Sequence, residues 1–357
     1  MANLEGRGLL ALRVVGVLTA LTLVLWTFHG VDRSRVADLV GHVGALTLLL
    51  VALPQFLSLS LECFGWRRVF AVWGRRVDQW SLLRVRLMTE AVAQTLPLGV
   101  IWSESLKPLL LARHAQVPAS ESVAAIVGRK YLLVSSQAVY VTALVAAGFG
   151  VLRHLSGALL GRPGYAWFAF GAGALLAILA LGVGGAFARG QVAQRAFELL
   201  RRLPSQRVRA ALQAQQHSFK KTDGFTEQYF AAPFLQSRLL PGVFFLCGWL
   251  CESLESFLIL RLLGADLSFF SVAAIEVMLS FVRNVVFVIP AGLGVQDIGY
   301  VSCLTALGVP DALTLAAAFS LLKRGKELFW ALIGYTLLAA EARLPQLRPE
   351  QLQPERA

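Results

Sequence analysis

The chain has 357 residues, of which 57% are hydrophobic and only 15% charged, and its mean hydropathy is +0.65. This number of polar residues is too small to cover the surface of a soluble domain. The composition therefore excludes a soluble globular protein and indicates a membrane protein. The net charge of +12 would suggest nucleic acid in a soluble protein. In a membrane protein, basic cytoplasmic loops explain it, and we expect no nucleic-acid partner.

Six apolar segments are long enough to cross a hydrocarbon core of about 30 Å as helices. In chain order they are Leu9–Phe28, Ala45–Leu61, Ala125–Val151, Tyr165–Ala188, Phe234–Leu263 and Ala312–Ala340. No small-x-small cleavage site follows the first segment, so we expect a retained helix and not a signal peptide. The four cysteines fall in or beside apolar segments, which favours core packing over a disulfide framework or a zinc site.

Basic residues set the predicted orientation. The segment 189–221 holds eight Lys and Arg against one acid, Glu198, which places it in the cytoplasm. Counting spans outward from it puts both termini in the cytoplasm of a multi-pass protein of the cytoplasmic (inner) membrane. We expect one integral membrane domain over 1–357, with a first half 1–188, a cytoplasmic connector 189–231, a second half 232–341 and a cytoplasmic tail 342–357.

Part of the connector, Gln191–Leu203, alternates apolar and basic residues at helical spacing. This pattern suits a helix on an anionic leaflet, and a plain solvated connector explains it equally well.

Two further apolar stretches are interrupted by proline and glycine. The predicted orientation requires residues 81–122 to leave the cytoplasm and return to it, with a break at Pro97 and Gly99. The arms, Leu82–Leu96 and Val100–Ala112, are about 22 and 20 Å long as helices, too short to span, and predict a re-entrant hairpin.

Residues 268–309 should leave the outer side and return to it, with a break at Pro290 and Gly292. This second hairpin is either re-entrant or fully spanning.

The two breaks belong to similar sequence patterns. Pro97, Glu104 and Pro118 correspond to Pro290, Asp297 and Pro310 at offsets of 193, 193 and 192. Because the hairpins enter from opposite sides, the halves would form an inverted repeat, which places a binding site near the midplane of many transporters. Chance recurrence of proline and glycine is the alternative. The predicted fold is an all-α, polytopic transmembrane helical bundle with two broken or re-entrant hairpins.

Ionisable residues lie within segments that should be buried, where each helix-centre charge costs about 2.5 to 3.5 kcal/mol. Some share a helix face, such as Glu276 with Arg283, and could be structural clasps. Their clustering around the breaks favours a polar groove for a charged or zwitterionic head group. The predicted binding residues are Glu90, Glu104, Lys107, Arg129, Lys130, Glu276, Arg283, Asn284, Gln296, Asp297, Lys323, Arg324 and Glu327.

Both breaks carry sequence that resembles a known family. The resemblance is carried by Leu96-Pro97-x-Gly99 with Glu104, Lys107 and Arg129, and by Pro290-Ala291-Gly292-Leu293-Gly294-Val295-Gln296-Asp297 followed by Leu321-Leu322-Lys323-Arg324. These runs resemble the signatures of the flippase-like membrane domain of lysylphosphatidylglycerol synthetases, and the resemblance covers about Gly44 to Glu341. It implies a protein of the lipid-translocation type, and we expect a stand-alone membrane region without the aminoacyl-transfer domain.

The leading functional hypothesis is a flippase-like translocase that moves a polar or charged lipid head group through a midplane cavity. The hairpin tips, Pro97–Glu104 and Pro290–Asp297, would line this cavity. Arg129, Lys323 and Arg324 would bind phosphate or another anion. Glu104, Glu276 and Asp297 would balance their charge or contact an amine.

We expect a transporter and not an enzyme, because no nucleophile or ligand set accompanies Glu252 and Glu255, the most plausible acid and base pair. No cofactor and no metal are indicated. The alternatives are a membrane-embedded enzyme or an accessory scaffold of lipid, glycolipid or hopanoid biosynthesis. Membrane lipids are the predicted partners, and association with a second copy or a lipid-synthesis protein stays open.

Overall fold

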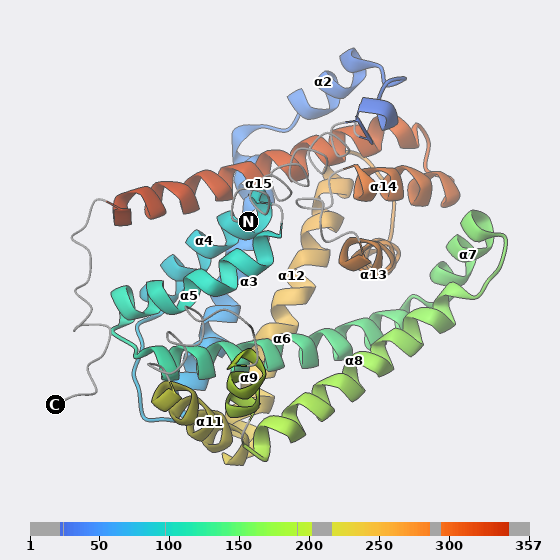
Figure 1. Ribbon diagram of the computed structural model, residues 1–357. Coiled ribbons are helices and arrows are strands. Elements are labelled where there is room, and N and C mark those ends of the chain that lie inside the picture. Colours follow the sequence, from blue (N-terminus) through green and yellow to red (C-terminus); the bar gives the residue numbers. More distant parts are fainter. Residues whose placement is uncertain are drawn as a thin grey trace, which may run out of the picture.

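The computed structural model describes residues 22–23, 25–96, 98–190, 192–201, 216–285 and 294–342, without the side chains at 45–48, 200, 282–285 and 342. All regular elements in these ranges are helices (Figure 1), which confirms the predicted all-α polytopic bundle. In chain order they are α2 (Arg33–Gly41), α3 (Ala45–Ala71), α4 (Gln79–Thr95), α5 (Gly99–Ala115), α6 (Ala119–Ala147), α7 (Phe149–Leu160), α8 (Tyr165–Ala188), α9 (Val192–Arg201), α11 (Gln216–Ala231), the π-helix η1 (Leu235–Leu239), α12 (Leu240–Leu262), α13 (Phe269–Val285), α14 (Val295–Ala306) and α15 (Ala312–Ala342).

Within the described residues, four helical segments are long and apolar enough to cross a membrane. They are Leu49–Ala71, Ala119–Ala147, Tyr165–Ala188 and Leu235–Leu262. The predicted spans in α3, α8 and α12 are confirmed as apolar helices of sufficient length. Most of the predicted first span, Leu9–Phe28, lies outside the described residues.

Two predicted spans differ from the structure. The predicted span Ala125–Val151 corresponds to α6, which is a candidate span but begins six residues earlier, at Ala119, and ends at Ala147. Gly148 separates it from α7, which begins at Phe149. Glycine has a low helix propensity, and this one sits against α13. The predicted Ala312–Ala340 is helical within α15, but this helix is absent from the candidate spans. Its middle carries Lys323, Arg324, Lys326 and Glu327, too many charges for a lipid-exposed crossing.

The first predicted hairpin is formed by α4 and α5, which pack against each other. The chain reverses between them, and Leu98 takes a left-handed conformation with φ of 55°. Gly99 is required at this point because a Cβ atom would lie 2.5 Å from the carbonyl oxygens of Val92 and Ala93. Pro97 itself lies outside the described residues.

The second predicted hairpin corresponds to α13 and α14. Residues 286–293, with the predicted break residues Pro290 and Gly292, lie outside the described part of the chain. Gly294, with φ of 79°, precedes α14. The carboxylate of Asp297 accepts a hydrogen bond from the Gly294 amide at 2.8 Å, which caps the start of this helix.

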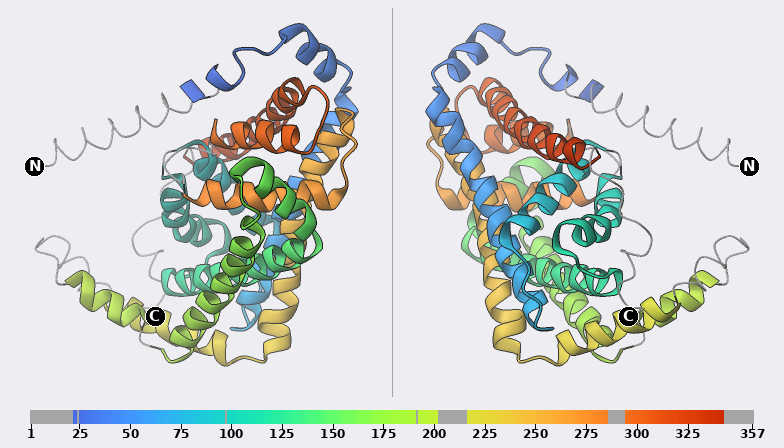
Figure 2. Two further views of the ribbon diagram at one scale, coloured as in Figure 1. Left: turned by 90° about the vertical axis from the view of Figure 1, so that its right-hand side faces the viewer. Right: turned by 90° about the vertical axis from the view of Figure 1, so that its left-hand side faces the viewer.

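The two halves repeat one order of elements, α3 to α6 and α12 to α15. The corresponding helices α3 and α12 lie side by side (Figure 2). They run antiparallel, since Gly65 adjoins Phe245 whereas the earlier Ser58 adjoins the later Gly248. When equivalent helices of two halves run in opposite directions, the halves are inverted relative to each other. The chain therefore contains an inverted repeat. The last long helices, α6 and α15, each contact both members of this pair.

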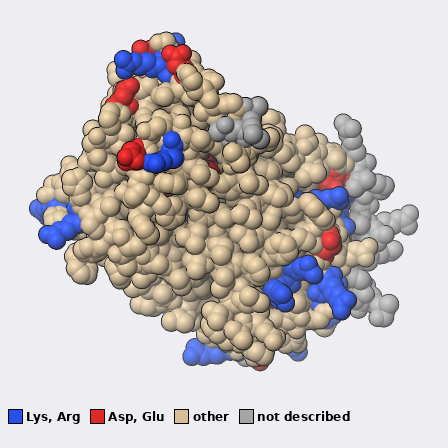
Figure 3. All heavy atoms as spheres, turned by 180° about the vertical axis from the view of Figure 1, so that it is seen from behind, with Lys and Arg blue, Asp and Glu red and all other residues tan. Residues whose placement is uncertain are grey.

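The face of the molecule seen from behind is largely apolar. From behind, side chains other than Lys, Arg, Asp and Glu cover the middle of the molecule, and the charged ones gather toward its edges (Figure 3). Helix α8 also exposes large apolar side chains, including Trp167, Ile178 and Leu181. Such a surface suits contact with lipid.

The connector 189–231 contains two helices, α9 and α11, within its described part. Helix α11 packs against α6 and α8 and buries Tyr229 and Phe230. In the predicted amphipathic stretch, Phe197 is buried and its ring centroid lies 5.4 Å from that of Phe219 in α11. Phe197, which belongs to the apolar face of this stretch, therefore packs against protein.

Candidate functional site

A polar cavity of about 130 Å³ lies between the two halves. Its walls come from α3 and α4 of the first half and from α12, α13 and α15 of the second. The lining residues are Gln55, Ser58, Leu59, Glu62, Arg86, Glu90, Gln94, Glu252, Glu255, Glu276, Lys323, Lys326 and Glu327. Among these described residues, six are glutamates and three are basic. The cavity is therefore shared by both halves and rich in carboxylates.

Glu62 of α3 is the centre of an ion-pair network in the first half. Its Oε2 atom accepts a hydrogen bond from Arg129 Nη2 at 2.7 Å and lies 3.0 Å from Arg86 Nη2. Arg86 also donates from Nη1 to Glu90 Oε2 at 2.9 Å. Because Arg86 and Arg129 are both buried, one carboxylate compensates two guanidinium groups from α4 and α6.

Glu104 of α5 is the second carboxylate of this network. Its Oε1 atom lies 2.7 Å from Lys107 Nζ and 2.6 Å from Lys130 Nζ. Lys107 is only 1% exposed, so its charge depends on this partner. The hairpin arm α5 is thereby tied to the long helix α6.

Glu276 of α13 is the centre of the network in the second half. Its Oε1 atom accepts hydrogen bonds from the hydroxyls of Ser256 and Tyr300, and from Lys323 Nζ at 3.0 Å. These donors come from α12, α14 and α15. One carboxylate therefore links all four helices of the second repeat.

Arg324 follows Lys323 on α15 and takes different partners. Its Nη1 atom donates to Glu327 Oε2 at 2.7 Å, and Nη2 donates to Gln296 Oε1 at 3.3 Å. Nη2 also lies 3.9 Å from Asp297 Oδ1, which accepts a hydrogen bond from the Ser320 hydroxyl at 2.6 Å.

The ion pairs recur in the two halves. Glu62 of α3 and Glu255 of α12 are 193 residues apart, the offset of the two hairpin breaks. Glu62 pairs with Arg129 of α6, and Glu255 accepts a hydrogen bond from Lys326 of α15 at 2.5 Å. In each half, the first long helix is thus joined to the last by a buried acid and base.

The acids that follow the two breaks also occupy equivalent positions in the two halves. Glu104 and Asp297 are also 193 residues apart. Glu104 pairs with Lys130 of α6, and Asp297 lies within ion-pair distance of Arg324 of α15. The inverted repeat therefore extends from the order of helices to the acids of these ion pairs, whereas their bases lie on equivalent helices at offsets of 197 and 194.

The predicted binding residues divide into two groups. Glu90, Glu276, Lys323 and Glu327 line the cavity. Glu104, Lys107, Arg129, Lys130, Gln296, Asp297 and Arg324 take part in the ion pairs and hydrogen bonds described above but do not line it. The side chains of Arg283 and Asn284 lie outside the described residues.

The predicted position of the hairpin tips at the cavity stays a prediction, because Pro97 and residues 290–293 lie outside the described part of the chain. Within the described part of the tips, neither Gly99–Glu104 nor Gly294–Asp297 lines the cavity. In the first half the flank of α4 faces it instead, through Arg86, Glu90 and Gln94. These residues are four apart and therefore share one helix face.

Nine of the described residues that line the cavity are not among the predicted binding residues: Gln55, Ser58, Leu59, Glu62, Arg86, Gln94, Glu252, Glu255 and Lys326. Glu62 could have been found from its offset of 193 from Glu255. Arg86 could have been found from its spacing of four to Glu90 on a helix.

The carboxylates pair with cations and with hydroxyl groups. In the part of the chain that the structure describes, no group of three or more His, Cys, Asp or Glu side chains could hold a metal ion. All four cysteines are free thiols. The arrangement can bind and orient charged or hydrogen-bonding groups in a setting shielded from lipid.

Comparisons with known proteins identify the family. No curated protein matches the chain. The family model described as the lysylphosphatidylglycerol synthase TM region matches residues 13–334. This range contains the first repeat, all but the last eight residues of the second, the cavity and both ion-pair networks. The chain therefore belongs to the family of the lysylphosphatidylglycerol synthase transmembrane region.

Proposed function

We propose that this membrane protein is a flippase-like lipid translocase that moves a polar or charged head group across the cytoplasmic membrane without chemical change. The observation that carries the proposal is the polar cavity with walls from both inverted halves. Charged residues within membrane proteins are costly and commonly mark a substrate path. A shared cavity at the interface of inverted repeats is the usual place of the substrate in secondary transporters.

The charges of the cavity favour one kind of head group. Six glutamates and three basic residues line its walls. Arg129 and Arg324, which do not line it, pair with Glu62 and Glu327, so the carboxylates are in excess by one. Opposite charge on the ligand compensates such an excess. A head group with a positively charged amine therefore suits the cavity best, while acyl chains stay in the surrounding lipid.

The size of the cavity implies a movement. A volume of about 130 Å³ lies below the roughly 300 to 1,000 Å³ of sites for drug-sized ligands. Helices α4 and α15 close one side, where a Cβ atom on Gly334 would meet the backbone of Leu87 and the side chain of Ala91. Translocation then requires the halves to part, as inverted repeats do in alternating access.

The remaining assignments follow from the proposed role. Membrane lipids are the partners, both termini are cytoplasmic, and the basic connector 189–221 faces the anionic leaflet. The hairpin α4–α5 is re-entrant, because each arm has 17 residues, or about 26 Å as a helix. This is shorter than the hydrocarbon core of about 30 Å.

The test is reconstitution in liposomes with lipids that carry fluorescent head groups of different charge. Access of a membrane-impermeant quencher reports movement between leaflets. Glu90→Gln removes a cavity charge that accepts a hydrogen bond from Arg86 at 2.9 Å. Because a charged hydrogen bond contributes about 1.5 to 3 kcal/mol, we expect transport of the amine-bearing lipid to fall about tenfold or more.

The matched control is Glu341→Gln, which removes a paired carboxylate outside the cavity. Glu341 lies 3.1 Å from His114 Nε2, near the end of α15, and this variant should transport normally. Equal transport by both variants would contradict the proposed path. Chemical turnover of the lipid by the purified protein would show an enzyme instead, and a stable partner with no transport activity would show a scaffold.

A further inference from the structure

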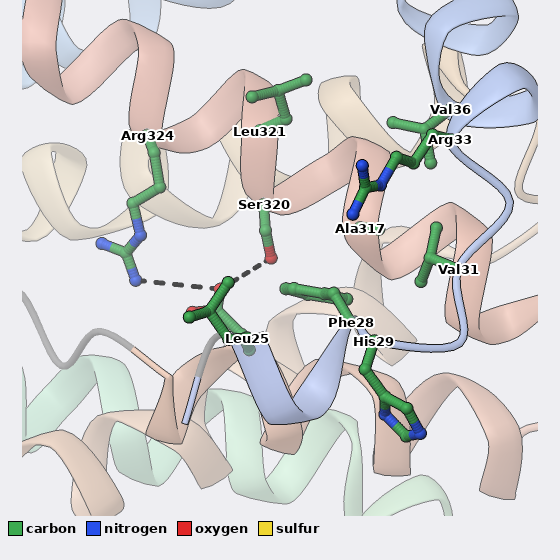
Figure 4. A pocket seen from close by; sticks show the side chains of 11 residues that line it. Leu25, Phe28, His29, Val31, Arg33, Val36, Ala317, Ser320, Leu321 and Arg324 are labelled. Carbon is green, nitrogen blue, oxygen red and sulfur yellow. Dashed lines mark hydrogen bonds and ion pairs between the residues drawn. The ribbon is translucent and has the colours of Figure 1, made fainter. Parts of the chain in front are cut away.

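A second and larger pocket, of about 660 Å³, lies on a different face of α15 from the cavity. Lys323 lines the cavity, whereas its neighbour Arg324 lines this pocket. The pocket is enclosed by α15 and by the segment 25–36, which ends in α2. Figure 4 shows the apolar side chains of Leu25, Phe28 and Leu321 around it. Its walls are thus mainly apolar, in contrast to the carboxylate-rich cavity.

Two guanidinium groups reach into this pocket. Arg324 comes from α15 and Arg33 is the first residue of α2, and Figure 4 shows them on opposite sides of Ser320. Among the described lining residues, Asp297 is the single acid. Its carboxylate is buried and accepts hydrogen bonds from the Ser320 hydroxyl at 2.6 Å and the Gly294 amide at 2.8 Å. Arg324 already pairs with Glu327 at 2.7 Å, whereas Arg33 belongs to none of the ion pairs among the described residues. An anion that enters beside the apolar wall therefore meets the guanidinium group of Arg33.

We infer that this pocket binds an anionic amphiphile. The hydrocarbon chain lies along Leu25, Phe28 and Leu321, and a phosphate group binds the guanidinium group of Arg33, with Arg324 of the lining as a second cation nearby. Arginine forks match phosphate oxygens, and an apolar wall with a few convergent polar groups is typical of ligand sites. The volume falls within the range of about 300 to 1,000 Å³ for such sites.

This inference goes beyond the proposed function, because the pocket and the cavity have different linings and lie on different faces of α15. A ligand of this pocket is bound at a second site and does not need to be transported. An assay of binding alone can therefore succeed or fail independently of head-group movement.

The experiment measures protection of an introduced thiol in phosphatidylcholine nanodiscs. Leu321→Cys places the thiol in the pocket at a position that is 54% exposed, and the parent chain reports the background from its native cysteines. We expect dodecyl phosphate to slow modification by N-ethylmaleimide several-fold. Dodecyltrimethylammonium, which has the opposite charge, and inorganic phosphate, which lacks a chain, should not protect.

Two variants in the Leu321→Cys background test whether Arg33 binds the phosphate group. Arg33→Gln should raise the dodecyl phosphate concentration for half-protection by about tenfold or more. Arg35→Gln is the matched control, since Arg35 is also on α2, lies 3.3 Å from Asp311 and does not line the pocket. It should leave protection unchanged.

Three results would overturn the inference. They are equal protection by the cationic amphiphile, protection by inorganic phosphate alone, and an unchanged response to dodecyl phosphate in Arg33→Gln. Because Arg33 is exposed at the surface, its replacement leaves the fold intact. Arg324→Gln, which changes a residue with further partners, provides a second measurement and should weaken protection in the same way.

Discussion

Glu276 and Lys323 show how a buried charge is kept in this protein. The carboxylate accepts hydrogen bonds from Lys323, Ser256 and Tyr300, which belong to three other helices. Removal of both ions from water is costly, and their mutual attraction offsets that cost only while both are present. Loss of one partner leaves the other charged and buried, which is worse than loss of the pair.

We therefore expect non-additive stability at this pair. Glu276→Gln and Lys323→Met should each destabilise the protein by about 3 to 5 kcal/mol. The double variant should recover most of that loss, because no lone charge remains. Thermal unfolding of the purified protein in one detergent measures all four species of the cycle. Losses that simply add in the double variant would contradict the ion-pair account.

The sequence predicted part of this residue-level organisation. Glu276, Lys323 and Arg324 were found because they are ionisable residues in apolar segments, where any charge requires an explanation. The sequence could not predict that Glu276 and Lys323 line the cavity whereas Arg324 lines the other pocket. This division depends on the rotation of α15 about its own axis, which packing against α3, α4, α12 and α14 determines.

At the scale of elements, the turn between α4 and α5 depends on the close approach of two backbones. Gly99 has no room for a Cβ atom, because the obstructing atoms are carbonyl oxygens of α4 and not flexible side-chain ends. Gly224 in α11 has nothing within 4 Å of the same position. The two glycines therefore differ in their environment although both belong to helices.

Gly99→Ala should destabilise the protein by about 1 to 3 kcal/mol, because the α4–α5 turn must shift to admit the methyl group. Gly224→Ala should stabilise it by about 0.5 to 1 kcal/mol, because alanine has the higher helix propensity and meets no obstacle. Chemical unfolding of both variants in mixed micelles gives the two free-energy changes. Equal effects of the two substitutions would refute the steric role of Gly99.

Element boundaries followed from the sequence where local chemistry decides them. Proline and glycine predicted the reversal near residues 97–99, and α8 begins and ends as its apolar run does. The break at Gly148 was missed because an isolated glycine within an apolar run is often tolerated in a helix. Gly148 also lies close to α13, where a Cβ atom would be 3.3 Å from Ala274.

At the scale of the whole molecule, the inverted repeat fixes relative orientation. Because α3 and α12 run antiparallel, the α3–α4 loop and the α12–α13 loop lie at opposite ends of the pair. The first loop contains Arg76 and the second contains Asp266, and both side chains are exposed. The basic residues of the first loop favour the cytoplasmic side.

This arrangement predicts that the α3–α4 loop and the α12–α13 loop are accessible from opposite sides of the membrane. In intact cells, a membrane-impermeant maleimide should label Asp266→Cys, and should label Arg76→Cys only after the membrane is permeabilised. Both variants are compared with the parent chain, which reports the native cysteines. Labelling of both positions from the same side would contradict the inverted topology.

The repeat itself was visible in the sequence as a constant offset between two breaks, but the cavity was not. The offset locates equivalent residues such as Glu104 and Asp297, yet it does not say which helix face points inward. The structure places the flank of α4 at the cavity and the acids after the breaks in neighbouring ion pairs. Long-range packing decides that choice, and a local pattern contains no information about it.

The adjacent positions of Lys323 and Arg324 have a consequence for the behaviour of both sites. Consecutive residues on an α-helix are about 100° apart, so one rigid element carries a wall of each site. Any turn or slide of α15 that changes one wall must displace the other. If occupancy of one site biases such a shift, reciprocity requires the other site to influence the first by an equal free energy. An anion held beside Arg324 would then act as an effector of whatever binds beside Lys323.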